Sequence, residues 1–283
     1  MAINARVTST GGARTIQVVE EPGLHVAENG TVTEIILDCP YILEENDNSG
    51  LTIKWYQVGN PIPVYQWIVS SSPPQALGIL EGRLDLSYKA SEDENHRHRA
   101  LKIINPSTEL SGQYQCKIST FDDEKDYLQK LIIYSKPQVV EVWTEQREDN
   151  VVTVVCEVDQ VYPQPNLHLC QRSADSDCIN LSGVKEVNSW SRGSYNMTVE
   201  REVHEDTLDG LTTFECVVTI PDTKVEMLDH TKYQPRLQVQ DPEEGCLEQG
   251  FDPDSISASL IAKAATASWR RYQHEDFQDI KDV

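Results

Sequence analysis

The chain of 283 residues lacks the features that would mark it as a membrane-spanning protein or as an enzyme of a familiar type. It has no run of about 18 consecutive apolar residues, so it offers no candidate transmembrane helix. It also contains no phosphate-binding loop, no zinc-binding frame and no nucleophile elbow. We therefore expect no cofactor, no metal centre and no enzymatic activity.

Basic residues are scarce in this sequence. There are 24 Lys and Arg against 46 Asp and Glu, which gives a formal net charge of −22 at pH 7. Because proteins bind nucleic acid by neutralising its phosphates with Lys and Arg, this balance argues against nucleic acid as a partner. It favours a soluble, self-repelling surface and a protein partner of basic or polar character.

Cysteine, by contrast, is well represented, with seven residues at recognisable spacings. Disulfides rarely persist in the cytosol, so these spacings indicate an oxidising compartment. Glycosylation sequons at Asn29, Asn180 and Asn196 agree with that interpretation. Residues 1–30 hold no apolar run of the kind a secretory signal peptide needs. We expect an extracellular protein, either held at the cell surface or secreted, whose signal peptide and membrane anchor are not present in this sequence.

The most informative pattern is Cys39 … Trp55 … Tyr114-Gln115-Cys116, embedded in stretches that alternate between apolar and polar residues. This frame resembles the variable-type domain of the immunoglobulin superfamily. In that fold, one cysteine from each of two sheets bridges the core, and a buried Trp packs on the bridge. A Tyr two residues before the second Cys pins a corner, as Tyr114 is placed to do.

The resemblance implies an all-β fold of two immunoglobulin-like β-sandwiches in tandem. A variable-type domain is expected over 15–135 and a constant-like domain over 137–240. Residues 241–283 are expected to form a disordered or partly helical tail. In the second domain Phe214 stands where the corner Tyr would be, and Leu169 takes the position of the Trp. The strands expected in the first domain are 31–39, 51–56, 64–69, 83–86, 100–103, 113–120 and 127–134.

The disulfide pairing follows from the fold rather than from counting, because six cysteines allow fifteen connectivities. The resemblance implies the bridges Cys39–Cys116 and Cys156–Cys216. Alternation turns Cys170 outward, and we predict that it pairs with Cys178 across a hairpin on the sheet surface. A half metal site is the alternative for this last pair, although no second pair at metal spacing accompanies it. Cys246 is predicted to be free.

One sheet face of the first domain carries the residues expected to contact a protein partner. Tyr and Trp are effective interface anchors because they bury a large area at a low entropic cost. Two of the candidates, Tyr65 and Trp67, share a face of the strand 64–69, and for them packing in the core is the open alternative. The predicted partner-binding residues are Tyr56, Tyr65, Trp67, Gln113, Gln115, Lys117 and Phe121.

Two further features involve basic residues. The cluster His96-Arg97-His98-Arg99 could bind an anionic glycan or sense pH, but a solvated turn balanced by the acidic residues 92–94 is the favoured interpretation. Arg83 lies where variable domains place an Arg that pairs with an Asp. Leu110 occupies the position of that Asp, so Arg83 lacks this partner and its role stays open.

In its layout, and in the runs around Trp55 and over 110–116, the chain resembles the insect beaten path family of axon-guidance and adhesion proteins. It is similar more loosely to vertebrate co-stimulatory and nectin-like receptors. Members of such families bind another immunoglobulin-superfamily protein on an opposing cell through the variable domain. The resemblance therefore implies a recognition or adhesion protein that acts through its N-terminal domain. The alternative is a soluble immune-type or ligand-sequestering protein that binds glycans or microbes.

Overall fold

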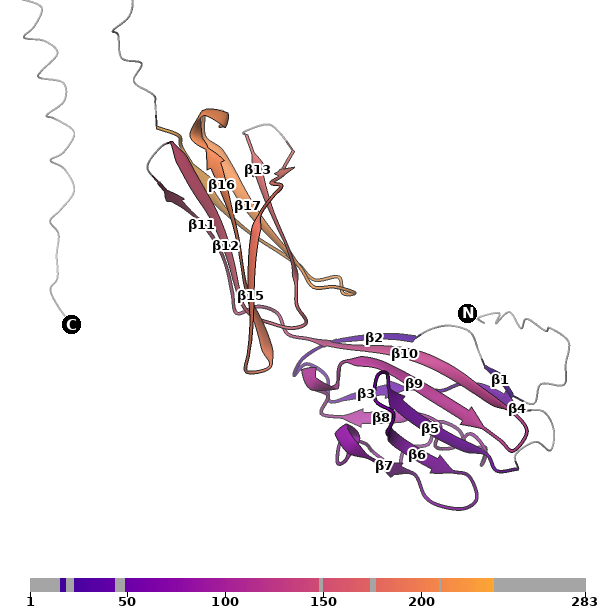
Figure 1. Cartoon of the computed structure of the whole chain (residues 1–283). Coiled ribbons are helices and arrows are strands. Elements are labelled where there is room, and N and C mark those ends of the chain that lie inside the picture. The colour runs from indigo at the N-terminus through magenta and orange to yellow at the C-terminus, as the bar shows by residue number, and fades with distance from the viewer. Residues whose placement is uncertain are drawn as a thin grey trace, which may run out of the picture. The chain divides into compact units, whose positions relative to one another are not determined.

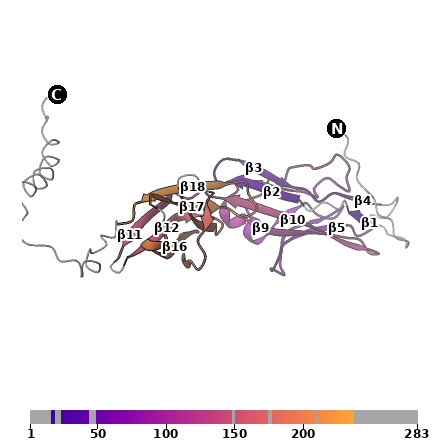
Figure 2. The same cartoon turned by 90° about the horizontal axis from the view of Figure 1, so that it is seen from above.

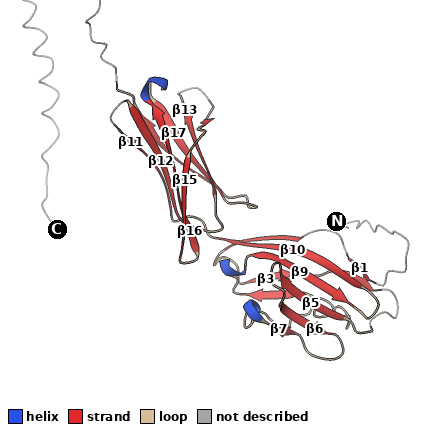
Figure 3. Cartoon of the chain, in the orientation of Figure 1, coloured by secondary structure: helices blue, strands red, loops and turns tan. Residues whose placement is uncertain are grey.

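The computed structural model describes residues 16–18, 23–43, 49–147, 150–173, 177–208 and 210–236. Within these ranges the chain is almost wholly β-strand, with short helical turns between strands (Figure 3). The strands form two sandwiches, one from β1 to β10 and one from β11 to β18, which confirms the predicted all-β fold (Figure 1). No helix among these residues is long and apolar enough to cross a membrane. Cys246 and the predicted tail lie outside the described residues.

The larger sheet of the first sandwich has the strand order β2-β10-β9-β5-β6-β7. β2 pairs with β10 in parallel, and the other neighbours are antiparallel. Figures 1 and 2 show β2, β10, β9 and β5 following one another across this sheet. Its strands are β2 (Gly23–Glu28), β5 (Thr52–Gln57), β6 (Pro63–Ile68), β7 (Gln75–Ala76), β9 (Gly112–Ser119) and β10 (Glu124–Tyr134).

The remaining strands of this sandwich form two pairs, β3 (Glu34–Leu37) with β8 (Leu101–Ile104), and β1 (Ile16–Val18) with β4 (Tyr41–Leu43). The strand expected over 83–86 is reduced to one isolated bridge between Leu84 and Ile103. Pairing stops there because the carboxylate of Asp85 accepts hydrogen bonds from the amide and the hydroxyl of Ser87, which turns the chain.

The core of the first sandwich is organised around the Cys39–Cys116 bridge, whose Cα atoms are 6.2 Å apart. Trp55 and Tyr114 are fully buried beside it in the same core. The Tyr114 hydroxyl donates to the carbonyl of Leu110 at 2.7 Å, so the tyrosine corner is present. Each buried aromatic thereby satisfies its polar group, since the indole of Trp55 donates to the carbonyl of Arg99 at 3.0 Å.

The basic cluster 96–99 is more than the solvated turn that was favoured from the sequence. Backbone carbonyls in and beside it accept hydrogen bonds from the hydroxyls of Tyr41 and Tyr65, in addition to the indole of Trp55. Residues 95–99 are half-buried as a result. Buried aromatic residues with polar tips need such partners, and this segment supplies them at one boundary of the core.

Arg83 has an acidic partner that the sequence did not identify. Its guanidinium lies 2.9 Å from the carboxylate of Glu109, so it has an ionic partner. Glu109 immediately precedes Leu110, the position at which an acidic residue was sought. Arg83 therefore forms an ion pair with an acidic residue one position before the one at which variable domains place it.

The second sandwich consists of the sheets β11-β12-β16-β15 and β14-β13-β17-β18. The Cys156–Cys216 bridge joins β12 to β17 across the core, with a Cα separation of 6.1 Å. Leu169 and Phe214 are buried beside it, as their positions in the frame predicted. The strands are β11 (Val139–Gln146), β12 (Val151–Val161), β13 (Asn166–Arg172), β14 (Ile179–Asn180), β15 (Lys185–Ser191), β16 (Ser194–His204), β17 (Thr212–Thr219) and β18 (Glu226–Tyr233).

A buried polar cluster in the second sandwich makes hydrogen bonds that Phe214 cannot make, because Phe214 has no hydroxyl. The carboxylate of Glu205 accepts hydrogen bonds from the hydroxyl of Tyr233 and, at 2.6 Å, from the amide of Gln146. The hydrogen bond from Tyr233 is the main reason that the pKa of Glu205 lies below its usual value. Burial, aided by the neighbouring carboxylate, raises the pKa of Tyr233 to about 12. The Tyr233 ring lies 6.5 Å from that of Phe214.

Candidate functional site: the outer face of the first sandwich

The large sheet of the first sandwich has one side against the core and one side turned away from it. On β9, the side chains of Tyr114, Cys116 and Ile118 point into the core. Successive residues of a strand point to opposite sides, so the residues between them point away. We call this side the outer face and define it by Leu24, Tyr56, Gln113, Gln115, Lys117 and Leu128.

The strand register brings these residues into adjacent rows. Gln115 on β9 lies opposite Tyr56 on β5 and opposite Leu128 on β10. In the next row Gln113 lies opposite Lys130, which in turn lies opposite Leu24 on the parallel strand β2. Directly opposed side chains in a sheet are about 5 Å apart at Cβ, so they form one continuous surface. Four predicted residues, Tyr56, Gln113, Gln115 and Lys117, are thus brought together.

Acidic residues of β10 neutralise and order the polar side chains of the outer face. Lys117 Nζ lies 2.9 Å from the carboxylate of Glu124, and the amide of Gln115 donates to Asp126 at 2.9 Å. The hydrogen bond to Glu124 raises the pKa of Lys117 above its usual value. Lys117 therefore remains charged throughout the physiological range. Polar groups held in this way beside exposed apolar side chains are typical of the rim of a protein interface.

Phe121 projects from the turn between β9 and β10 with 82% of its surface exposed. Its backbone amide donates to the carbonyl of Ser49 at 3.0 Å, which ties the turn to the neighbouring loop. Its ring covers Gly50, where an added Cβ would come within 2.5 Å of the ring. Asp123, in the same turn, accepts hydrogen bonds from Lys125 and from the amide of Ile16. The backbone that carries the exposed ring is thus held in place, which lowers the entropic cost of ordering this turn on binding.

Tyr65 and Trp67 do not belong to this face, and the prediction that they contact a partner is wrong. They are 2% and 5% exposed and form part of the core. The register explains this, because Tyr65 lies opposite Trp55 and Trp67 lies opposite Ile53, and both opposed residues point inward. The Tyr65 hydroxyl donates to the carbonyl of His98 at 2.6 Å. Core packing, the open alternative, is what the structure shows.

Leu24 and Leu128 are residues of the outer face that sequence reasoning missed. They are 52% and 49% exposed, which is high for leucine in a folded domain. Alternation along 127–134 could have placed Leu128 outward. No local signal identifies Leu24, because its place depends on the parallel pairing of β2 with the distant strand β10.

The side chains of His96, His98 and Arg99 in the basic cluster are engaged with groups of the protein itself. The Arg99 guanidinium forms two hydrogen bonds of 2.8 Å with the carboxylate of Asp38. The His96 ring lies 3.1 Å from the carboxylate of Asp93, and its hydrogen bond holds the pKa of Asp93 below its usual value. The His98 ring is bonded to the carbonyl of Tyr88 at 2.9 Å. These groups therefore do not form an open cationic surface of the kind an anionic glycan needs.

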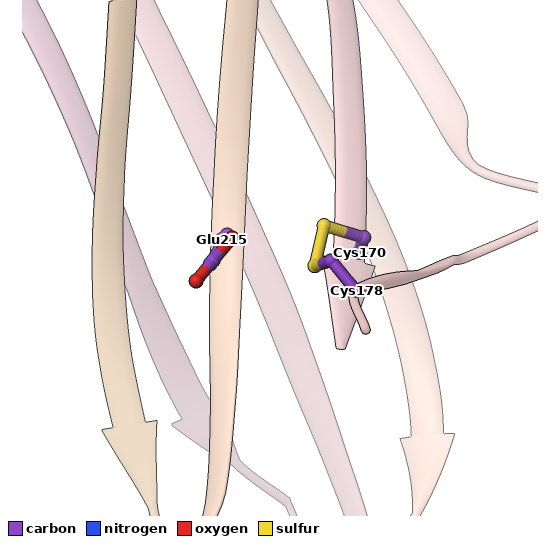
Figure 4. A group of neighbouring side chains, drawn as sticks. All are labelled: Cys170, Cys178 and Glu215. Atoms are coloured by element: carbon purple, nitrogen blue, oxygen red, sulfur yellow. A yellow bond between two sulfur atoms is a disulfide. The ribbon is translucent and has the colours of Figure 1, made fainter. Parts of the chain in front are cut away.

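The surface hairpin of the second sandwich contains the Cys170–Cys178 bridge, with Cα atoms 5.6 Å apart (Figure 4). The carboxylate of Glu215, on the neighbouring strand, lies close enough that the three side chains resemble a metal-ligand set. The sulfur atoms are joined to each other, and Arg172 pairs with the carboxylate of Glu215. Cys170 was expected to point outward. It lies outside the core cluster yet is only 4% exposed.

No protein-family profile matches this chain. Among curated proteins, it is 25% identical over 179 residues to human MAM domain-containing glycosylphosphatidylinositol anchor protein 2 and 27% identical to the mouse protein. The aligned part is 58% of this chain but 17% of each of those proteins. The chain thus spans about a sixth of the length of the curated relatives it matches.

Two solved structures match this chain over about three quarters of its length. Bovine butyrophilin matches with a TM-score of 0.55 at 13% identity, covering 77% of this chain and 97% of that one. A chain from the structure of ICOS in complex with ICOS-L and an anti ICOS-L VNAR domain matches with a TM-score of 0.52 at 13% identity, covering 75% and 99%. The fold they share with this chain is the immunoglobulin-like β-sandwich. At this level of identity the similarity concerns the fold alone.

Proposed function

We propose that this protein is an extracellular recognition protein whose first sandwich binds another immunoglobulin-superfamily ectodomain through the outer face. The row Leu128–Gln115–Tyr56 carries this proposal. Apolar and aromatic groups lie there beside ordered polar groups, and the 82% exposed ring of Phe121 lies at one end of the same sheet. Interfaces between proteins combine an apolar centre with a polar rim in this way.

The chemistry of the outer face suggests what its partner offers. A specific contact buries roughly 800 Å² on each side, which a sheet of this size can provide. Tyr56, Leu128 and Phe121 are the anchors, and Gln113 and Gln115 supply hydrogen bonds. The formal net charge of −22 favours a partner with basic residues around its own apolar centre, because such a partner is attracted during diffusional encounter.

The proposal extends to location and role. Three disulfides in the described residues support an oxidising, extracellular compartment. The solved complex of ICOS with ICOS-L supports a protein as the partner here. We take axon guidance as the biological setting on the strength of the resemblance to the beaten path family. The engaged basic cluster gives no support to the alternative of glycan binding.

The test is a binding measurement with the glycosylated ectodomain secreted from eukaryotic cells. The ectodomain is made tetrameric and screened against a panel of immunoglobulin-superfamily ectodomains displayed on cells. For the partner found, Tyr56→Ala, Leu128→Ala and Phe121→Ala are then compared with the wild type. Truncating a central anchor is expected to cost about 2 kcal/mol, which is about thirtyfold in affinity.

Matched control variants separate the outer face from the rest of the protein. Ile42→Ala removes a side chain of the first sandwich that is 52% exposed and lies outside the face. Leu228→Ala does the same in the second sandwich, at 53% exposure. Both controls should bind like the wild type. The proposal fails if the three face variants bind normally while Leu228→Ala abolishes binding.

A further inference from the structure

One lateral side of the second sandwich is open, and the topology identifies it. β11 lies against β18, and the Cys156–Cys216 bridge sets β12 over β17. The sheet orders then place β16 over β13 and β15 over β14. β14 and β15 therefore border the same side, and residues 181–184 connect them directly. We call β14, residues 181–184 and β15 the open side.

The open side exposes both sheet edges and apolar side chains. Among the described strands β15 pairs with β16 alone, and all seven of its residues are exposed. Ile179, Val187 and Trp190 are exposed by 61%, 55% and 56%. An exposed edge strand presents unpaired backbone groups, and with apolar side chains it becomes a template for pairing with another chain. On the opposite side β11 and β18 lie against each other instead.

One predicted glycosylation sequon begins on the open side, and a second lies on β16, the strand next to it. Asn180 is the exposed last residue of β14. Asn196 lies on β16 opposite Ser189 of β15, and the sequon hydroxyl residue Thr198 lies opposite Val187. The side-chain oxygen of Asn196 accepts a hydrogen bond of 2.9 Å from the amide of Gln160. Its nitrogen, the atom that carries a glycan, has no hydrogen bond among the described residues.

We propose that N-glycans on Asn180 and Asn196 cover the open side and prevent the second sandwich from pairing edge to edge with a second copy. In the attachment step the side-chain nitrogen bonds to C1 of the first sugar of a lipid-linked oligosaccharide. The nitrogen gives up a proton, and the lipid pyrophosphate leaves. N-glycans are bulky and solubilising, and natural proteins cover or block exposed edge strands. This role is independent of partner binding by the outer face of the first sandwich.

The experiment uses the whole chain secreted from eukaryotic cells. Peptide mass spectrometry is expected to find glycans on Asn180 and Asn196. Light scattering coupled to gel filtration is expected to show a glycosylated monomer for the wild type. For the double variant Asn180→Gln/Asn196→Gln it should show a mass equal to or above that of a dimer. Trimming the glycans of the folded wild-type protein with an endoglycosidase should give the same shift without depending on refolding.

Two variants establish that the edge is responsible. Asn29→Gln removes a sequon of the first sandwich and should leave the protein monomeric. Val187→Lys, added to the double variant, places a charge on the exposed edge and should restore the monomer. The proposal is overturned if either asparagine is unoccupied or if the glycan-free protein stays monomeric. It is also overturned if Asn29→Gln associates equally or if Val187→Lys restores nothing. The proposed partner binding would stand in all these cases.

Discussion

The two sandwiches stabilise one frame with different side chains. In the first, Trp55 lies opposite Cys116 on the neighbouring strand, and the Tyr114 hydroxyl bonds to the carbonyl of Leu110. In the second, Leu169 occupies the position opposite Cys216, and the buried Phe214 has no hydroxyl to offer. The bridge therefore requires apolar bulk on the neighbouring strand rather than a Trp. The polar anchor can be supplied from elsewhere, as it is by Tyr233.

The outer faces of corresponding sheets differ in a way that bears on function. In the first sandwich Tyr56, Gln115 and Leu128 share an open surface. In the second, the corresponding sheet carries the Cys170–Cys178 bridge beside the buried carboxylate of Glu215. A covalent link and the ion pair between the half-exposed Arg172 and the buried Glu215 occupy that face. The comparison favours the first sandwich as the one that meets a partner.

The largest expected effect concerns the disulfides. The Cys39–Cys116 bridge belongs to the frame that both sandwiches share, whereas the Cys170–Cys178 bridge is particular to the second sandwich. In the loop-entropy model, losing the Cys39–Cys116 bridge, which spans 77 residues, costs about 4.5 kcal/mol. Losing the Cys170–Cys178 bridge, which spans 8 residues, costs about 2.5 kcal/mol. Denaturant unfolding of the two double Cys→Ala variants measures the difference. Equal losses would show that loop length does not govern their contributions.

An intermediate effect is expected at the tyrosine corner. Tyr114→Phe makes the first sandwich resemble the second at this position and leaves the buried carbonyl of Leu110 without its hydrogen bond. Such a loss costs about 1–2 kcal/mol. Thermal unfolding checks it, with Tyr56→Phe as the control, because Tyr56 is half-buried on the outer face. If both variants melt alike, the corner hydrogen bond contributes nothing particular to stability.

The smallest effect is a pH dependence confined to the second sandwich. Because the pKa of Glu205 is lowered in the folded state, its stabilising contribution is fully present above the unfolded value of about 4.3. The contribution is lost as the pH falls through the lower folded pKa. As the pH is lowered, the unfolding temperature of the second sandwich should therefore fall less in Glu205→Gln than in the wild type.

The exposed Glu226 on β18 provides the matched control for that measurement. Glu226→Gln should leave the acid dependence as it is in the wild type. An unchanged profile in Glu205→Gln would show that other carboxylates cause the loss of stability in acid.

Much of the frame could be predicted because it depends on local patterns. Alternation around Cys39, Trp55 and Cys116 identifies strands and their inward residues, and the structure buries all three. The hairpin at Cys170 was likewise predictable from the inward position of Leu169. The partner of Arg83 was missed because Glu109 lies one residue before the position at which the acidic residue was expected. The structure still brings its carboxylate within 2.9 Å of the Arg83 guanidinium.

The sequence by itself determined that the chain folds into two sandwiches with cysteines facing across their cores. Only the tertiary structure decided which side of a strand faces outward, because alternation is compatible with two opposite assignments and the register between strands selects one. Pairing with β5 turned Tyr65 and Trp67 into the core, and parallel pairing with β10 brought Leu24 to the outer face. Likewise, the open side between β14 and β15 arises from the order of strands in two sheets. These properties depend on contacts between residues far apart in the chain, which local patterns do not encode.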